Sequence, residues 1–170
     1  MRDPTSWLIC GTTGRWAASL RLALVRKLAL DAHTQLPRHI REVYSVCACD
    51  SALQEHCDAI VLVEIRSENL AEALHLIATC LDRKTPVFAL LGESLHQQNL
   101  TRHVSRNDRE AIIAAIGEAG ALDVLDTPRQ IARVLEVVAR GIAARPAIAA
   151  AADLATLAEF AQAAVPWQDA

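Results

Sequence analysis

The chain has few aromatic residues and no long apolar run. Aromatic residues make up 4% of its 170 residues, so we expect a core built mainly from aliphatic side chains. No stretch reaches the roughly 20 apolar residues that a membrane-spanning helix needs. The N-terminus also has no apolar segment of signal-peptide type. We therefore expect a cytoplasmic protein that does not enter a membrane.

A net positive charge is lacking as well. The formal net charge is −3 and 52% of the residues are hydrophobic, which excludes a disordered chain and a globally basic nucleic-acid binder. The five cysteines are an odd number, which fits poorly with a disulfide framework. In a cytoplasmic protein they are interpreted as reduced thiols.

Two of the cysteines lie close together, at Cys47 and Cys49, and His56 and Cys57 come soon after. In a strand, Cys47 and Cys49 would point the same way. A metal or redox site is one interpretation, but a single intervening residue is the wrong spacing for common structural zinc sites. We favour small apolar core residues and no metal.

The chain does contain the run Ala59–Ile65, which is short, apolar and rich in β-branched residues. Such a run is typical of a strand that is buried on both faces inside a parallel sheet. Open α/β sheets bind ligands at the carboxyl ends of their strands. A functional site is therefore expected just after this strand, around Glu64 to Asn69.

Strand-like and helix-like segments alternate on both sides of this run. The expected strands are 7–10, 43–47, 59–65, 87–91 and 122–125, and the expected helices are 17–28, 50–56, 70–81, 107–119 and 129–144. Capping signals predict where several helices begin and end. They are capping boxes at Asn69–Glu72 and Asn107–Glu110, a C-terminal glycine at Gly120 and the pair Thr127–Pro128.

Five β–α units joined by right-handed crossovers predict a three-layer α/β sandwich around a five-stranded parallel sheet. Pro146 is expected to end the regular part. The predicted organisation is therefore one domain over residues 1–146, with an alanine-rich helical tail over residues 147–170.

The second half of the chain has a particular pattern: the strand Thr85–Leu90, the segment Glu118–Leu125 that enters strand five, then Pro128 and the closing helix. This pattern resembles the receiver domain of bacterial response regulators. The resemblance covers residues 5–145. It implies a flavodoxin/receiver-like sheet with strand order 2-1-3-4-5.

A working receiver carries a carboxylate pair after strand one, a phosphoacceptor aspartate at the end of strand three, a Ser/Thr after strand four and a lysine before the proline after strand five. The corresponding positions here are Cys10 and Gly11, then Val63 or Glu64 depending on a one-residue register choice, and Thr127. Thiols do not suit Mg²⁺, and neither valine nor glutamate forms the usual aspartyl phosphate.

The resemblance therefore implies a pseudo-receiver that lacks the phosphorylation site. It implies no catalytic residue, no metal and no cofactor. The function it implies is protein–protein interaction in bacterial signalling or regulation.

Two features near the expected site have a second interpretation. Glu64 either acts as a permanent negative charge where a phosphate would sit or forms a salt bridge with Arg66, and we favour the salt bridge. The turn Gly11-Thr12-Thr13-Gly14 lies between a strand and a helix, where backbone N–H groups bind phosphates. It matches neither the dinucleotide nor the Walker pattern, so a plain turn is favoured. A small-ligand or nucleotide sensor that uses this turn is the alternative function.

The last helix and the tail carry more apolar residues than one sheet face needs. Large exposed apolar patches are rare in soluble monomers, so we expect a homodimer. The candidate interface residues are Ile131, Val134, Leu135, Val138, Ile142, Leu154, Leu157, Phe160 and Trp167.

The long connection 92–107 and the start of the next helix concentrate positive charge. Its basic residues are His96, Arg102, His103, Arg106 and Arg109. A solvated loop is the default interpretation, and a docking surface for an acidic partner or for nucleic acid is the alternative. No aromatic residues accompany the charges, which counts against binding of single-stranded nucleic acid.

Overall fold

The central run forms strand β3 (Ala59–Ile65), as predicted, and all seven of its residues are buried. The structure is a computed structural model that describes residues 6–31, 36–55, 58–92, 95 and 106–150. A strand buried on both faces needs a packed layer on each side of its sheet. The rest of the described chain supplies these two layers.

The sheet has five strands, and every pairing in it is parallel. They are β1 (Ser6–Cys10), β2 (His39–Val43), β3, β4 (Val87–Leu91) and β5 (Val124–Leu125). Their order across the sheet is β2-β1-β3-β4-β5, which is the flavodoxin-like order 2-1-3-4-5. The predicted fold class and strand order are confirmed.

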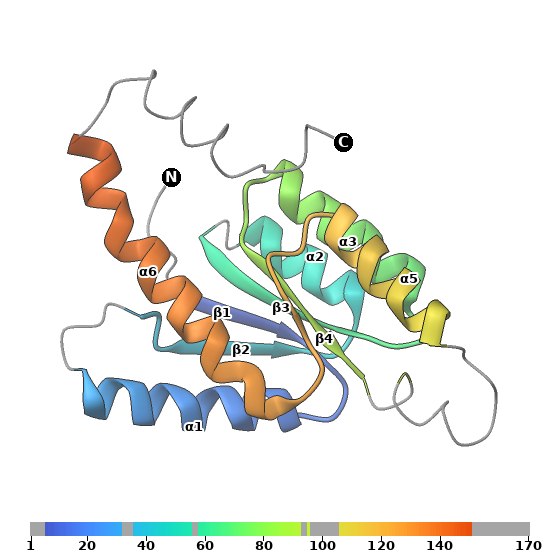
Figure 1. Ribbon diagram of the computed structural model, residues 1–170, viewed down its shortest axis with the longest axis horizontal. Coiled ribbons are helices and arrows are strands. Elements are labelled where there is room, and N and C mark those ends of the chain that lie inside the picture. The colour runs from blue at the N-terminus through green and yellow to red at the C-terminus, as the bar shows by residue number, and fades with distance from the viewer. Residues whose placement is uncertain (1–5, 32–35, 56–57, 93–94, 96–105, 151–170) are drawn as a thin grey trace.

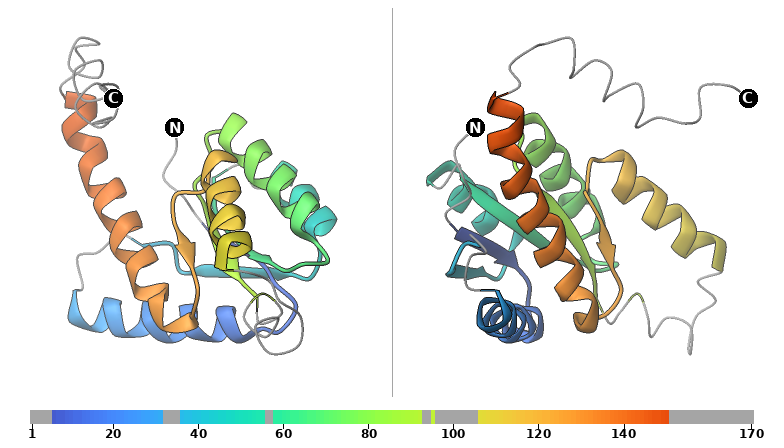
Figure 2. Two further views of the ribbon diagram at one scale, coloured as in Figure 1. Left: turned by 45° about the vertical axis from the view of Figure 1, so that its right-hand side comes forward. Right: turned by 60° about the vertical axis from the view of Figure 1, so that its left-hand side comes forward.

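The helices lie on both faces of the sheet (Figures 1 and 2). Helices α1 (Arg15–Leu30) and α6 (Ile131–Ala150) cover one face, and α2 (Val46–Glu55), α3 (Leu70–Asp82) and α5 (Arg106–Glu118) cover the other. Successive side chains of a strand point to opposite faces, so Leu62 packs in the α1–α6 layer and Val63 in the α2–α3 layer. This alternation decides where the side chains at the end of β3 go.

The second strand is not where the sequence pattern placed it. It ends at Val43, and the predicted strand residues Val46 and Cys47 begin helix α2 instead. Ser45 causes the change, because its Oγ accepts the Ala48 backbone N–H at 3.1 Å and caps the helix. The predicted helix start at residue 50 is therefore wrong as well, because α2 begins at Val46.

The relative orientation of two cysteines changes with this correction. On a helix, Cys47 and Cys49 point to different sides, and the structure has Cys47 exposed and Cys49 fully buried. His56 and Cys57 lie outside the described residues. The shared direction expected for a strand is thus lost.

The end of the domain also differs from the prediction. Helix α6 comes directly after a single 3-10 turn, Pro128–Gln130, and continues through Pro146 to Ala150. Alanine has the highest helix propensity, and the alanine-rich sequence here offsets the one backbone bond that a proline removes. The predicted boundary between residues 146 and 147 therefore falls inside a helix. Among the described helices, α6 included, none is long and apolar enough to cross a membrane.

Two details of the helices refine the predicted core. The inward face of α3 is centred on Ala73, Leu76, Ile77 and Cys80, whereas Leu81 is 54% exposed. The core is mainly aliphatic, as expected, but Trp7, Trp16 and Phe88 are among its largest fully buried side chains.

Gly120 ends α5 as the sequence predicted, with a positive φ of 107°. A Cβ added there would lie 2.7 Å from Cδ2 of Leu81, so alanine is strained in both backbone and packing. We expect Gly120→Ala to lower the free energy of unfolding by more than about 1 kcal/mol. Urea denaturation of the purified protein measures it.

Gly117 provides the matched control in the same helix. A Cβ added there meets nothing within 4 Å, and Gly117 has no positive φ. Gly117→Ala should raise the free energy of unfolding by about 0.5–1 kcal/mol, because alanine favours a helix interior over glycine. Equal effects of the two substitutions would contradict the packing described for Gly120.

Candidate functional site

The carboxyl end of β3 carries a buried charge. In the sheet register Cys10 pairs with Val63, so Glu64 lies one residue beyond the end of β1. Val63 packs in the α2–α3 core, and Glu64 is only 2% exposed. A buried carboxylate needs partners, and its partners define the site.

The partners of Glu64 come from the turn after β1 and from the residue two positions on. Its Oε2 accepts the backbone N–H of Thr12 at 3.0 Å and lies 3.5 Å from the Thr12 hydroxyl. Its Oε1 pairs with Nη2 of Arg66 at 3.4 Å. The salt bridge predicted between Glu64 and Arg66 is therefore present, and the same carboxylate also bonds the glycine-rich turn.

Gly11 allows this contact. A Cβ at Gly11 would lie 3.1 Å from Oε2 of Glu64, which is tighter than nearly all such contacts in proteins. The Gly11 backbone N–H is already bonded to the carbonyl of Val43 at 3.0 Å. The turn thus holds the carboxylate through close approach of its backbone, as phosphate-binding turns hold an anion.

Arg66 is positioned by its surroundings on the other side of the carboxylate. Its side chain packs over Gly92, where a Cβ would come within 2.8 Å of Cγ of Arg66. It also pairs with the exposed Glu68 at 3.5 Å. Its buried Nε has no hydrogen-bond partner among the described residues.

Asn69 ties the end of β3 to the start of α3, a role that the sequence analysis missed. Its Oδ1 accepts the Arg66 backbone N–H at 2.7 Å, and its Nδ2 donates to the carbonyl of Glu64 at 3.0 Å. It makes no side-chain cap bond to α3, so the predicted capping box with Glu72 is not formed. The signal for the observed role was an asparagine three residues after Arg66, which follows the strand, a spacing typical of local side-chain turns.

The rest of the turn faces a second carboxylate. Gly14 takes the left-handed conformation with φ 66° and precedes α1 without a side-chain cap. A Cβ at Gly14 would lie 3.8 Å from Oε2 of Glu42, which itself pairs with Arg21. Thr12 and Thr13 are exposed. An anion bound here would meet both Glu42 and Glu64, and like charges oppose binding.

Three cysteines lie buried in the core between the sheet and the α2–α3 layer. They are Cys10, Cys49 and Cys80, from β1, α2 and α3. The hydrogen bond with the Cys10 thiol, together with burial, raises the pKa of Cys49, and burial raises the pKa of Cys80 to about 11. Cys49 and Cys80 therefore stay protonated at neutral pH and are weak nucleophiles. Within the described ranges, no cluster of three His, Cys, Asp or Glu residues could hold a metal ion.

Thr127, at the predicted lysine position, lies after β5. It is exposed, and its backbone N–H donates to Oε1 of Gln130 at 3.3 Å. Gln130 also accepts the Asp126 N–H at 2.7 Å. These bonds fix the backbone just before the last helix. The structure therefore brings Cys10, Gly11 and Glu64 together, whereas Thr127 belongs to a separate local structure.

The predicted interface residues have mostly an internal role. Ile131, Val134, Leu135 and Val138 are all less than 9% exposed and pack against the sheet and α1. Nothing is described for the side chain of Ile142, and Leu154, Leu157, Phe160 and Trp167 lie outside the described residues. The homodimer stays a prediction, but the described stripe does not provide a free surface for it.

The basic residues of the long connection lie largely outside the described part of the chain, at His96, Arg102 and His103. For Arg106 only the helical backbone is described. Arg109 pairs with Asp126 at 2.5 Å and so fixes α5 to the end of β5. At least this one cation is structural.

A groove of about 450 Å³ lies between α2 and α3. Its lining includes the exposed Cys47 and His75, and an ion pair between Asp50 and Arg83 at 3.4 Å. Within the described residues no hydrogen bond joins Cys47 to His75, and a nucleophile needs a base within such reach. This groove does not have the geometry of a nucleophilic site.

No family model matches the chain, and comparisons with curated proteins and with solved structures gave no match.

The buried ion pair leads to a test of the site. Glu64→Gln keeps the shape of the side chain but removes the charge that bonds Thr12 and Arg66, so we expect the free energy of unfolding to fall by about 1–3 kcal/mol. Glu68→Gln removes an exposed carboxylate from the same arginine and should have a much smaller effect. Denaturant unfolding measures the free energy of unfolding of both variants. Equal decreases would show that the buried Glu64 carboxylate stabilises the fold no more than the exposed Glu68 carboxylate does.

Proposed function

We propose that the chain is a non-catalytic, receiver-like module that acts through protein–protein contacts in bacterial signalling or regulation. The observation that carries the proposal is the Glu64 carboxylate, which already bonds the turn after β1. In a working receiver this region holds the metal-binding carboxylates and the phosphoryl group. Here a side chain of the protein itself supplies the negative charge.

The charge balance around Glu64 supports the same proposal. Arg66 is shared between Glu64 and Glu68, and Glu42 faces the turn from β2. A phosphoryl group carries close to two negative charges and needs cations or free N–H donors. The Thr12 N–H and the two terminal nitrogens of Arg66 are already engaged by carboxylates.

The proposal predicts that acetyl phosphate does not phosphorylate the protein. The full chain is incubated with acetyl phosphate and Mg²⁺, and its intact mass is recorded beside that of a working receiver treated in the same way. We expect no mass change in this chain, because no aspartate stands at the end of β3. An adduct of one phosphate that disappears in Glu64→Ala would overturn the proposal.

The alternative function, a small-ligand or nucleotide sensor, is favoured by one observation. Gly14 opens α1 in the left-handed conformation and leaves the first turn without a side-chain cap. Helix N-termini of this kind bind anions through backbone N–H groups and the helix dipole. The carboxylates of Glu42 and Glu64 oppose such binding.

A panel of nucleotides decides between the two functions. A ligand that binds only the native state raises the melting temperature by mass action. We expect no rise at millimolar concentration, because the turn already holds a carboxylate. A rise that is lost in Gly14→Val would favour the sensor, since valine at a positive φ blocks the close approach of a ligand to the backbone.

A further inference from the structure

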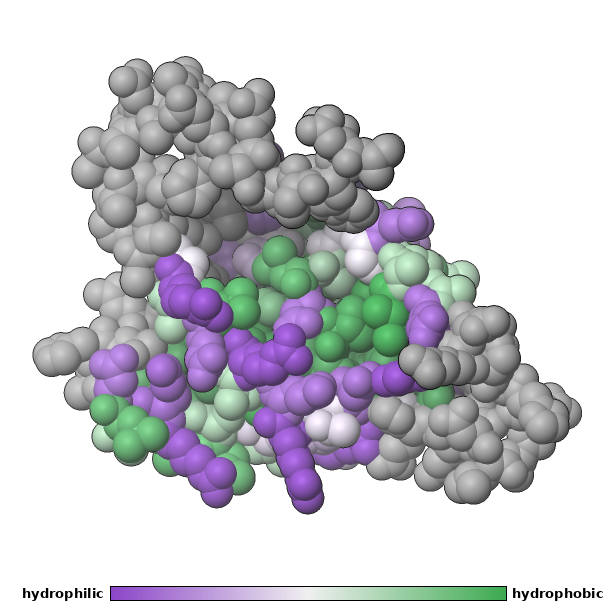
Figure 3. All heavy atoms as spheres, viewed as in Figure 1, coloured by the Kyte–Doolittle hydropathy of each residue, from purple (hydrophilic) through white to green (hydrophobic). Residues whose placement is uncertain are grey.

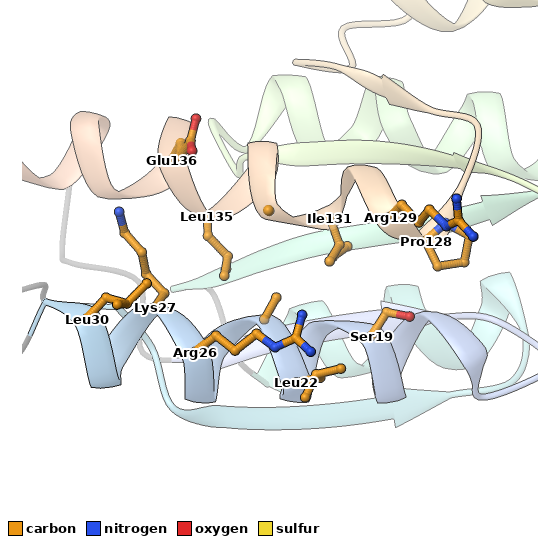
Figure 4. Close-up of a pocket in the computed structure, with 12 residues that line it drawn as sticks. Ser19, Leu22, Arg26, Lys27, Leu30, Pro128, Arg129, Ile131, Leu135 and Glu136 are labelled. Carbon is orange, nitrogen blue, oxygen red and sulfur yellow. The ribbon is translucent and has the colours of Figure 1, made fainter.

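A groove of about 460 Å³ runs between α1 and α6, on the face of the sheet opposite the α2–α3 groove. Figure 4 shows Ile131 and Leu135 pointing from α6 toward α1, and Lys27 extending from α1 toward α6. Leu22 and Leu30 also line it and are 52% and 87% exposed. Leucines this exposed beside a groove give its occupant apolar surface to cover.

The charge of the groove is positive in a chain whose net charge is −3. Arg26, Lys27 and Arg129 line it against a single acid, Glu136. Among the described residues none of these cations forms an ion pair, whereas the neighbouring Arg21 and Arg133 pair with Glu42 and Asp123. Figure 3 shows hydrophilic residues interspersed with hydrophobic ones along this face. An occupant with both carboxylates and large apolar side chains fits this lining.

The segment 151–170 of the same chain has this chemistry. It carries Asp153, Glu159 and Asp169 and has neither lysine nor arginine. Its large apolar residues are Leu154, Leu157, Phe160, Val165 and Trp167, and the first three recur every third residue. The segment lies outside the described residues, and its composition is complementary to the groove in both charge and hydrophobicity.

The distance that the segment must cover is short enough. It starts directly after Ala150, at the end of the helix that forms one wall of the groove. At the helical rise of about 1.5 Å per residue, Ala150 lies about 21 Å from Glu136 and about 32 Å from Arg129, which both line the groove. Twenty residues reach about 30 Å as a helix and about 65 Å when extended, so a partly extended segment spans the whole groove.

We propose that the α1–α6 groove is the docking site of the chain's own segment 151–170. The apolar residues of the segment cover Leu22 and Leu30, and the carboxylates of Glu159 and Asp169 pair with Arg26, Lys27 and Arg129. The inference concerns a different surface from the Glu64 site and goes beyond the proposed function. A second copy of the chain presenting the same groove is disfavoured, because two sets of unpaired cations would face each other.

Trp167 provides the readout in the full-length protein. Trp7 and Trp16 are at most 1% exposed, so quenching of tryptophan fluorescence by neutral acrylamide reports mainly on Trp167. We expect Trp167 to be shielded in the native chain at low salt. High salt should increase quenching, because it screens ion pairs at the surface. Trp167→Phe identifies the signal.

Paired charge reversals distinguish an effect of the groove cations from an effect of the net charge of the protein. Arg26→Glu/Arg129→Glu should raise the quenchable fraction severalfold, since both cations line the groove. Arg38→Glu/Arg140→Glu makes the same change in net charge at exposed residues outside the groove and should leave quenching unchanged. Adding Glu159→Arg/Asp169→Arg to the groove variant should restore shielding by exchanging the charges. Circular dichroism verifies that each variant is folded.

Three outcomes would overturn the proposal. One is that Trp167 in the native chain is quenched as readily as in a synthetic 151–170 peptide. Another is that the two charge-reversal pairs have equal effects. The third is shielding that increases with protein concentration, with light scattering showing a dimer, which would assign the segment to a second copy.

Discussion

Burial of β3 on both faces is the constraint on which the rest of this structure depends. All seven residues of the strand are inaccessible, so the sheet needs a helical layer on each side and every crossover must return over one face or the other. Polar groups cannot be placed along such a strand without large cost and are confined to its ends. The chemistry of the central sheet is therefore decided by the residues after Val63.

The first of these residues is Glu64, whose carboxylate reaches from β3 to the turn after β1. Its contacts with Thr12 and Arg66 join three neighbouring parts of the sheet edge, and Asn69 extends them to the start of α3. The carboxylate of Glu64 is therefore neutralised by groups of the protein itself at the carboxyl ends of the strands. This is the place where open α/β sheets bind ligands. The glycines at 11 and 92 serve this internal packing, because a Cβ at Gly11 would crowd the Glu64 carboxylate at 3.1 Å and a Cβ at Gly92 would lie 2.8 Å from Cγ of Arg66.

With that edge occupied by the protein itself, the outer surface of the α1–α6 layer is the most distinctive part of the described molecule. The inward stripe of α6 is used by its own core, so the surface beside it is formed by α1 and by the first turns of α6. It combines apolar side chains with cations that form no ion pair within the described chain. Such a combination fits contact with a polypeptide better than binding of a small anion, because an anion alone leaves the leucines exposed.

The sequence by itself determined the layers and most of the strands. Hydrophobic periodicity and the positions of glycine, proline and capping residues are local features of the sequence. Neighbouring residues alone therefore predict β3, β4, α3, the glycine after α5 and the turn at Thr127–Pro128. It also identified Glu64 and Arg66 as partners, because a charge that ends a buried strand must be neutralised nearby. Edge strand β2 was predicted at the wrong residues, since it is half-exposed and its apolar pattern is weak. Only the tertiary structure decided that Glu64 bonds a turn 52 residues away, that the stripe of α6 is buried, and that Arg26 and Arg129 line one groove. These facts depend on how elements distant in the sequence pack side by side, which no local pattern encodes.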